Sequence, residues 1–144
     1  MNASLNALFA TRAGFGLSII RILVGLIFMA HGSQKLFGLF GGYGLEGTGQ
    51  WMESIGLAPG YLMALLSGSA EFFGGLALVL GLLARPAALA LSVTLVVAIF
   101  SVHIGNGLFM SNNGYEFALA LLGGTLAVLV EGAGRLSLDR LIAR

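Results

Sequence analysis

The chain contains no cysteine, and this absence removes several kinds of chemistry at once. Without thiols, the 144-residue sequence cannot build a disulfide, a thiolate metal site or a cysteine redox relay on its own. Charge is scarce as well, because only 9% of the residues are Asp, Glu, Lys or Arg, against about 25% in soluble domains. The net charge of +1 and the lack of any basic run with interleaved aromatic residues exclude nucleic acid as a partner.

Apolar residues make up 58% of the chain and the mean hydropathy is +0.98, which indicates that the lipid bilayer surrounds it. Four apolar stretches, residues 15–37, 61–84, 86–103 and 115–131, come near the ~20 residues that a membrane-spanning helix needs. The 23 glycines include several within these stretches, where small residues let helices pack closely. The sequence therefore predicts an all-α integral membrane four-helix bundle, with residues 1–144 as one four-span domain.

The connection between the first two stretches, residues 38–60, is too long for a simple turn. Thr48 is a plausible N-cap for a short interfacial helix, with Trp51 and Met52 on one face and Gly56 as a stop signal. We favour a clip on the membrane surface, since tryptophan at an interface needs no further reason. A lid over a site at the outer end of the bundle is the alternative.

Orientation follows from lysine and arginine, which are enriched on cytoplasmic flanks. If all four stretches span the membrane, one side carries Arg12, Arg85, Arg135, Arg140 and Arg144. Both termini are therefore predicted to be cytoplasmic. The tail, residues 132–144, is predicted to form a short amphipathic cytoplasmic helix that contacts lipid headgroups or a partner.

Ionisable side chains inside or at the edges of the apolar stretches are the strongest functional signal. They are Arg21, His31, Lys35, Glu71, His103 and Glu116. Each charged group in hydrocarbon costs roughly 2.5–3.5 kcal/mol even on a lenient scale. A chain that carries several of them must pair them or use them, so the sequence predicts a buried polar site.

Helical geometry brings most of these residues toward one end. At 100° per residue, Arg21, His31 and Lys35 fall within an arc of about 80° on the first stretch. Arg21 lies about 15 Å deeper than His31, because ten residues rise 1.5 Å each. Arg21 therefore belongs to a different layer from the other two.

The remaining stretches approach His31 and Lys35 from the same side. Glu71 lies about halfway along the second stretch, on a strip that also contains Ser67, and His103 ends the third stretch. Glu116 begins the fourth stretch at the same end. We expect these side chains to converge in the outer half of the bundle.

At these positions the sequence resembles the DoxX family of small bacterial inner-membrane proteins. The resemblance rests on an ordered set of motifs that covers nearly the whole chain. They are Arg21, His31-Gly-Ser-Gln-Lys35, Glu71-Phe-Phe-Gly-Gly, His103, Gly114-Tyr-Glu116 and Gly134-Arg-Leu-Ser-Leu-Asp139. The resemblance implies a bacterial inner membrane location.

The resemblance also implies redox chemistry, since relatives are associated with thiosulfate:quinone oxidoreductase, with quinone or catechol stress and with a mycobacterial complex that handles oxidative stress. The leading hypothesis is a quinone site opening to the outer leaflet, in which His31, Glu71, His103 and Glu116 carry the proton chemistry. A neutral histidine can hydrogen-bond a quinone oxygen, a buried carboxylate can accept a proton, and Lys35 can stabilise negative charge on the ligand. Arg21, Lys35 and Ser67 are the predicted ligand-binding residues.

Electrons need an acceptor, and the sequence has no cysteine, haem-attachment motif or flavin fingerprint. The acceptor would be a soluble or membrane oxidoreductase partner or a bound metal, which makes this chain an accessory subunit.

Two alternatives stay open. One is a metal site that uses His31 and His103 with Glu71 or Glu116. The other is a non-enzymatic scaffold or assembly factor whose polar residues pair with one another, for example Arg21 with Glu71. A homo-oligomer is compatible with each of these hypotheses.

Overall fold

The computed structural model describes residues 2–11 and 14–143, and every regular element in those residues is helical. No strand occurs in this part of the chain. The chain is thus an all-α membrane protein, as predicted. Arg12 and Arg144, two of the arginines in the orientation argument, lie outside the described residues.

The helices follow one another with short connections. Their bounds are α1 (Ala3–Phe9), α2 (Phe15–Phe37), α3 (Gly44–Ser54), α4 (Gly60–Leu80), α5 (Ala84–Ala98), the π-helical turn η1 (Ile99–His103), the 3₁₀ turns η2 (Ile104–Asn106) and η3 (Met110–Asn112), α6 (Glu116–Glu131) and α7 (Leu138–Ile142).

Within the described residues, the helical segments long and apolar enough to cross a membrane are α2, α4 and the run Ala84–Asn106 that continues α5. α6 has 16 residues, a length of about 24 Å at 1.5 Å per residue. That falls short of the ~30 Å hydrocarbon core. The fourth predicted span is therefore a shorter helix, which packs along α5.

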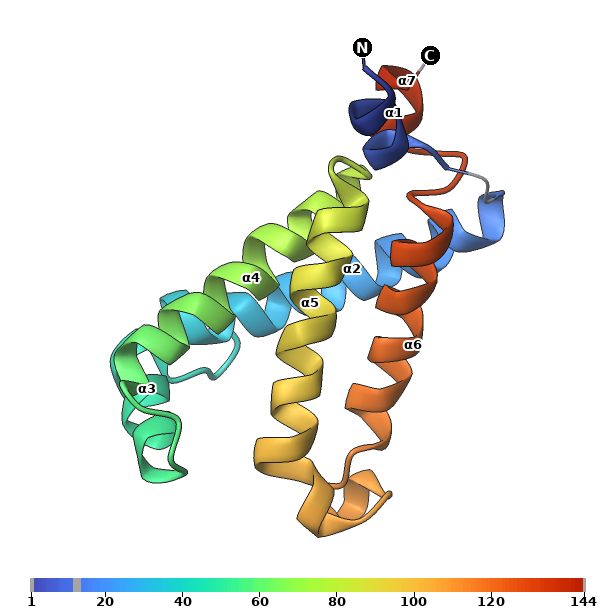
Figure 1. The fold of residues 1–144 in the computed structure, drawn as a ribbon. Helices are drawn as coiled ribbons and strands as arrows, with labels where there is room; N and C mark the ends of the chain where they lie inside the picture. The colour runs from blue at the N-terminus through green and yellow to red at the C-terminus, as the bar shows by residue number, and fades with distance from the viewer. Residues whose placement is uncertain (1, 12–13, 144) are drawn as a thin grey trace.

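The long helices form two pairs, α2 with α4 and α5 with α6. Figure 1 shows the pairs meeting at the end of the molecule that holds α1, α7 and both termini, which we call the terminal end. Toward the opposite end, α4 and α5 diverge, and α3 packs beside α4. The two pairs splay apart there, so a compact four-helix bundle is not confirmed.

Two helix ends differ from the sequence prediction. α4 stops at Leu80 because Gly81 takes a left-handed conformation (φ 67°), and α5 begins at Ala84. α3 begins at Gly44, so Thr48 lies buried within the helix and the prediction that it is the N-cap was wrong. Packing of α3 on α4, where Gly49 meets the backbone of Tyr61, outweighs the local capping signal.

Close backbone contact holds α2 against α4. A Cβ atom added to Gly25 would lie 2.7 Å from the carbonyl oxygen of Gly75, and one added to Gly75 would lie 2.7 Å from that of Gly25. Gly32 meets the backbone of Phe72 in the same way. Small residues thus let two membrane helices approach more closely than any side chain would allow.

A polar junction fastens the terminal end. Arg21 is completely buried, and its guanidinium donates hydrogen bonds to the carbonyls of Leu78 and Val79, the latter at 3.0 Å. It also donates to the carbonyls of Ala133 at 2.7 Å and Leu136 at 2.5 Å. Arg21 thereby donates to carbonyls in the last turn of α4, where that of Leu78 also accepts from the N–H of Gly81 at 3.2 Å, and ties the tail to them.

Asp139 binds the beginning of α5, the next helix at this junction. Its carboxylate accepts hydrogen bonds from the backbone N–H groups of Leu83 (2.7 Å) and Ala84 (2.9 Å), where α5 begins. Burial raises the pKa of the Asp139 carboxyl above its ordinary value, although these two hydrogen bonds and the charge of Arg21 act in the opposite direction. Since Asp139 is 1% exposed, the tail around α7 is partly built into the molecule rather than only lying on a surface.

We expect Gly25→Ala to destabilise the protein by about 1–3 kcal/mol, the usual cost of overpacking a tight contact. The added methyl group would press on the Gly75 carbonyl and push α2 from α4. Thermal unfolding in detergent, followed by circular dichroism, measures the loss. Gly123→Ala is the matched control, because a Cβ atom there meets nothing within 4 Å; equal effects of the two variants would contradict the packing argument.

We expect Arg21→Gln to cost about 3 kcal/mol or more, because several buried carbonyls lose their donor and each such loss costs about 1–3 kcal/mol. The same unfolding measurement applies. Arg135→Gln is the control, because Arg135 is exposed. Its guanidinium carbon lies over the ring of Phe15, 5.0 Å from the ring centroid. An Arg21→Gln protein as stable as the control would show that the junction does not hold the terminal end together.

Candidate functional site

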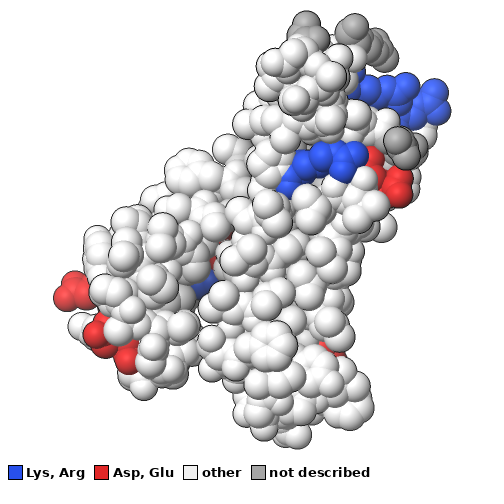
Figure 2. All heavy atoms as spheres, in the orientation of Figure 1, with Lys and Arg blue, Asp and Glu red and all other residues white. Residues whose placement is uncertain are grey.

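A cleft of about 700 Å³ lies where α4 and α5 diverge, and α3 covers part of it. Its walls are mostly apolar, and its polar side chains come from four separate parts of the chain. The polar lining residues are Lys35, Ser67, Glu71, Thr94, His103 and Asn113. Figure 2 shows this hollow between the lobe that includes α3 and α4 and the lobe that includes α5 and α6. Blue and red atoms are visible inside it among white ones.

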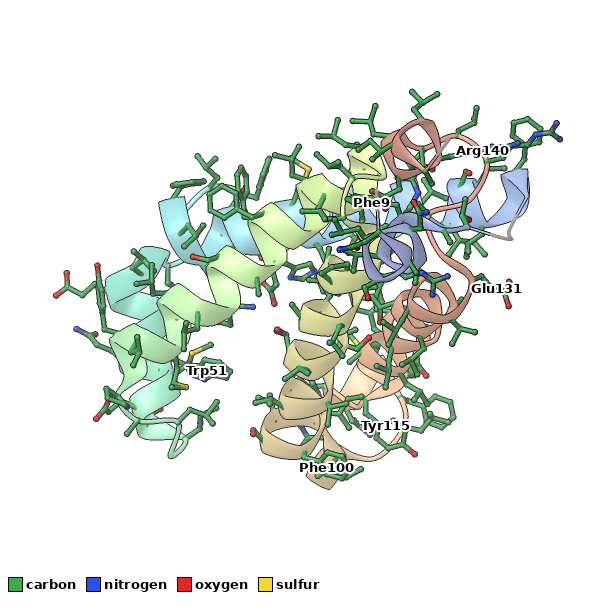
Figure 3. The ribbon with its side chains drawn as sticks, turned by 45° about the horizontal axis from the view of Figure 1, so that its top comes forward. Phe9, Trp51, Phe100, Tyr115, Glu131 and Arg140 are labelled. Carbon is green, nitrogen blue, oxygen red and sulfur yellow. The ribbon has the colours of Figure 1, made fainter. Side chains whose placement is uncertain are left out.

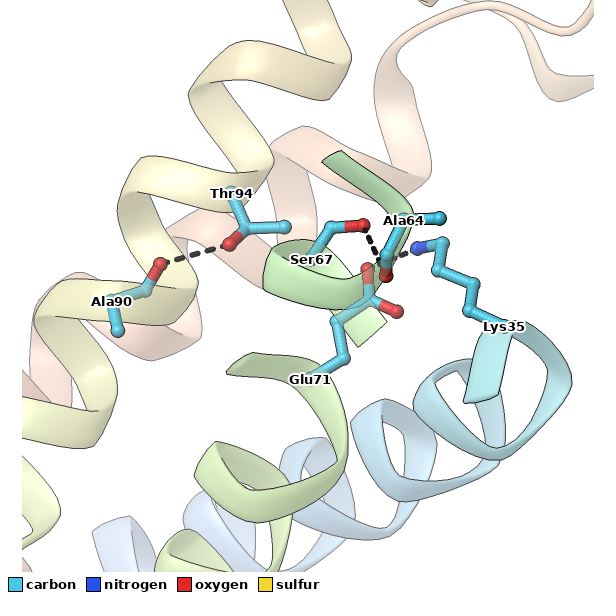
Figure 4. Close-up of polar contacts among 6 residues, drawn as sticks. All are labelled: Lys35, Ala64, Ser67, Glu71, Ala90 and Thr94. Atoms are coloured by element: carbon cyan, nitrogen blue, oxygen red, sulfur yellow. Dashed lines mark hydrogen bonds and ion pairs between the residues drawn. The ribbon is translucent and has the colours of Figure 1, made fainter. Parts of the chain in front are cut away.

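An ion pair lies at the bottom of the cleft. The Nζ atom of Lys35, in the last turn of α2, is 2.5 Å from Oε1 of Glu71, in the middle of α4 (Figure 4). The side chains are 23% and 8% exposed, respectively. Gly68 makes room for this approach, because a Cβ atom at that position would lie 3.1 Å from Cβ of Lys35.

The second carboxylate oxygen of Glu71 is different. Among the described residues, Oε2 of Glu71 is the buried side-chain oxygen or nitrogen that has no hydrogen-bond partner. Buried polar groups in proteins are nearly always paired, so an exception calls for an explanation. A ligand in the cleft that donates a hydrogen bond would provide one.

Two hydroxyl groups face the same space from opposite walls. Ser67 on α4 donates to the carbonyl of Ala64 at 3.4 Å, and Thr94 on α5 donates to that of Ala90 at 3.0 Å (Figure 4). Each hydroxyl hydrogen is thereby directed to the helix backbone. The oxygens keep lone pairs that can accept a hydrogen bond from a ligand.

His103 stands on the α5 wall of the cleft, at the end of the π-helical turn η1. Its Nδ1 atom is 2.9 Å from the carbonyl oxygen of Asn113. A carbonyl only accepts hydrogen bonds, so Nδ1 carries the hydrogen and Nε2 of the neutral ring is an acceptor. π-Helical turns occur frequently at functional sites.

Of the predicted site residues, the structure brings Lys35, Ser67, Glu71 and His103 to this cleft and places three elsewhere. Arg21 lies in the junction at the terminal end and does not pair with Glu71. His31 is exposed on α2, and its ring centroid is 6.2 Å from that of Phe117 on α6. Glu116 begins α6, away from the cleft lining.

Comparison with known proteins agrees with this architecture. The family model described as DoxX matches residues 16–104. This chain belongs to the DoxX family. The matched segment contains α2 from its second residue, together with α3, α4, α5 and η1, and so every cleft-lining residue except Asn113. The resemblance inferred from the sequence motifs is therefore confirmed.

Curated relatives have nearly the same length as this DoxX-family chain. Inner membrane protein YqjF of Escherichia coli (strain K12) is 33% identical, over 88% of this chain and 92% of that protein. "Putative oxidoreductase CatD" of Bacillus subtilis (strain 168) is 33% identical, over 86% of this chain and 84% of that protein. An uncharacterized membrane protein of Mycobacterium tuberculosis is 34% identical, over 87% and 80%. No solved structure matches the chain.

Several cleft residues escaped the sequence analysis. Thr94 and Asn113 line the cleft, and a threonine in an uncharged apolar stretch that also holds Ser92 and Ser101 was only a weak signal for Thr94. Trp51 and Met52, which we interpreted as a membrane clip, also line it. Figure 3 shows Trp51 projecting from α3 toward α5, which favours the second interpretation, a cover over a site.

The metal alternative gains no support from the geometry. Within residues 2–11 and 14–143, no three His, Asp or Glu side chains come together in a group that could hold a metal ion. His31 and His103, the two proposed histidine ligands, lie on different parts of the molecule, since only His103 lines the cleft.

We expect Lys35→Met to destabilise this DoxX-family protein by about 3–5 kcal/mol, because it leaves the Glu71 carboxylate buried without its partner. The double variant Lys35→Met/Glu71→Gln should recover part of that loss, since no unpaired charge remains. Thermal unfolding of the wild type, both single variants and the double variant forms the cycle that measures the coupling. Additive effects would show that the ion pair makes no specific contribution.

Proposed function

We propose that the cleft between α4 and α5 binds a quinone-type ligand and that the protein is a redox-linked accessory subunit in the bacterial inner membrane. The observation that carries the proposal is the buried Lys35–Glu71 pair, with Glu71 Oε2 left free, at the bottom of an apolar cleft. Ionisable residues within membrane segments mark functional sites by default.

The size and lining of the cleft fit such a ligand. Small-molecule sites usually measure about 300–1,000 Å³ and combine apolar walls with a few polar groups, and this cleft of about 700 Å³ does the same. Its rim includes Trp51, Leu66, Val93 and Val97, large apolar side chains that are 40–60% exposed. In a bilayer these side chains face lipid, so a lipid-soluble molecule has a direct route into the cleft.

The polar groups suit a ring that carries two oxygens. Lys35 offers N–H donors and a positive charge, and Glu71 can take a proton from a ligand hydroxyl. On the α5 wall, Nε2 of His103 is a second acceptor. When bound, a quinone supplies the electron chemistry, and these side chains bind the ring, orient it and hold its protons.

The redox role needs a partner. The name of the Bacillus subtilis relative, "Putative oxidoreductase CatD", fits redox chemistry in the family. Because this sequence has no cysteine, it offers no thiol relay of its own for the electrons. We propose that a membrane or soluble oxidoreductase partner receives them.

We also propose that both termini face the cytoplasm. Arg85, Arg135 and Arg140 lie at the terminal end, where Figure 2 shows blue side chains gathered. Red side chains gather on the lobe that includes α3, where Glu46 and Glu53 are exposed, and also beside the blue ones at the terminal end, so it is the surface arginines that are unevenly distributed. This asymmetry matches the positive-inside rule, and the name of the Escherichia coli relative supports an inner membrane location.

Binding can be measured with the natural tryptophan. Trp51 is the only tryptophan in the chain and it lines the cleft. A benzoquinone with a short isoprenoid tail, titrated into protein in lipid nanodiscs, should quench the fluorescence of Trp51 saturably, since quinones quench indole on contact. Ala90→Phe, which fills the cleft from α5, should weaken this binding at least tenfold.

Ala120→Phe is the matched control, because Ala120 is also an exposed alanine but lies on α6, outside the cleft lining. It should bind like the wild type. Quenching that rises without saturation, or that is the same in both phenylalanine variants, would mean that the quinone only partitions into lipid and that the proposed function is wrong.

A further inference from the structure

The hydrogen bonds already made inside the cleft restrict what a ligand can offer. The hydroxyl hydrogens of Ser67 and Thr94 are directed to the carbonyls of their own helices, at 3.4 Å and 3.0 Å. The Nδ1 hydrogen of His103 is donated to the Asn113 carbonyl. These side chains therefore present acceptors to the cleft.

The decisive acceptor is Oε2 of Glu71. Glu71 is 6% exposed, its Oε1 atom is paired with Lys35, and its Oε2 atom has no partner among the described residues. Leaving a buried acceptor unpaired costs free energy, and a hydrogen bond to a charged group is among the stronger ones. A bound molecule that brings a donor to Oε2 removes that cost, whereas one without a donor leaves it in place.

Hydroquinones and quinones differ in this property. A hydroquinone hydroxyl both donates and accepts, but a quinone carbonyl only accepts. The donors that remain in the cleft, on Lys35, on the indole of Trp51 and on the side-chain amide of Asn113, can serve the oxygens of either form. Oε2 of Glu71 therefore distinguishes the two forms, because the reduced form alone can donate to it.

We infer that the cleft selects the reduced, hydroxyl-bearing form of its aromatic ligand, a hydroquinone, over the corresponding quinone. This inference rests on the proposed function and adds to it which redox state the protein holds. Sites that depend on a ligand hydroxyl discriminate strongly against analogues that lack it, since their own buried polar groups are then left unpaired. By linkage, tighter binding of the reduced form raises the reduction potential of the bound couple above that of the free couple.

The test compares the two redox states of one short-tailed benzoquinone. Each is titrated anaerobically into the full-length protein in nanodiscs, and its dissociation constant is measured from Trp51 fluorescence and from calorimetry. We expect the hydroquinone to bind at least about tenfold more tightly, which corresponds to about 1.4 kcal/mol. Glu71→Gln, whose amide nitrogen offers a donor in place of Oε2, should abolish or reverse this preference.

Glu116→Gln is the control, because Glu116 lies outside the cleft, and it should keep the wild-type preference. A second pair of ligands on wild-type protein makes the test independent of whether Glu71→Gln folds. This pair is a redox-inert phenol and its methyl ether, with the same ring and tail, and the phenol should bind more tightly.

The outcomes separate the two proposals. Equal affinities of both ligand pairs for the wild type would overturn the inference and leave the quinone site standing, as when a water molecule already donates to Oε2. An unchanged preference in Glu71→Gln would also overturn it. If neither redox form bound saturably, both the inference and the proposed function would fail.

Discussion

The backbone contact between α2 and α4 is the interaction on which the rest of the structure depends. Gly25 and Gly75 bring the two helix backbones together, and Gly32 and Gly68 continue the contact toward the cleft. In lipid there is no hydrophobic force between helices, so close packing and hydrogen bonds must hold them. Because α2 lies this close to α4, the short distance from Lys35 to Glu71 is available to the side chains.

At the terminal end, side chains provide hydrogen-bond partners for the backbone groups at the ends of helices. Helix ends carry N–H and C=O groups without partners, and lipid offers them no water. Arg21 satisfies the end of α4, Asp139 the beginning of α5, and Arg85 donates to the Val130 carbonyl at the end of α6 at 2.7 Å. Since both helix pairs are fastened at this end, they can separate at the other without losing the fold. The cleft, lined by residues of α4 and α5, lies on the side where the helices are not tied together.

Much of the fold could be predicted from composition and spacing. Apolar runs predict helices, and small residues predict close packing, because both depend on local chemistry. Helix ends were harder to predict from the sequence. Thr48 looks like an N-cap in isolation, yet α3 starts at Gly44 because packing on α4 determines where this helix begins. The divergence of α4 from α5 has no signal in any single helix, since it depends on how the two pairs meet.

The sequence predicted which residue types form the site, but not which of the candidate residues lie together in it. The 100° rule placed Arg21, His31 and Lys35 on one stripe of α2, and an arc of about 80° is wide enough to face more than one neighbour. Lys35 meets α4, whereas His31 lies against Phe117 of α6. Periodicity shows which face of a helix a residue occupies, but not which helix covers that face.

A buried ion pair is weak evidence for stability, because removing two charges from water costs about as much as their attraction returns. A buried charge with a purely structural role would therefore gain by satisfying all its oxygens or nitrogens, as Arg21 does with backbone carbonyls and Asp139 with backbone N–H groups at the terminal end. Glu71 departs from that pattern, since Oε1 is paired and Oε2 is not. Buried charged groups are therefore fully hydrogen-bonded at the terminal end and only partly hydrogen-bonded in the cleft. Complete pairing at the terminal end fits a junction, and incomplete pairing in an accessible cleft fits a site whose missing donor arrives with the ligand.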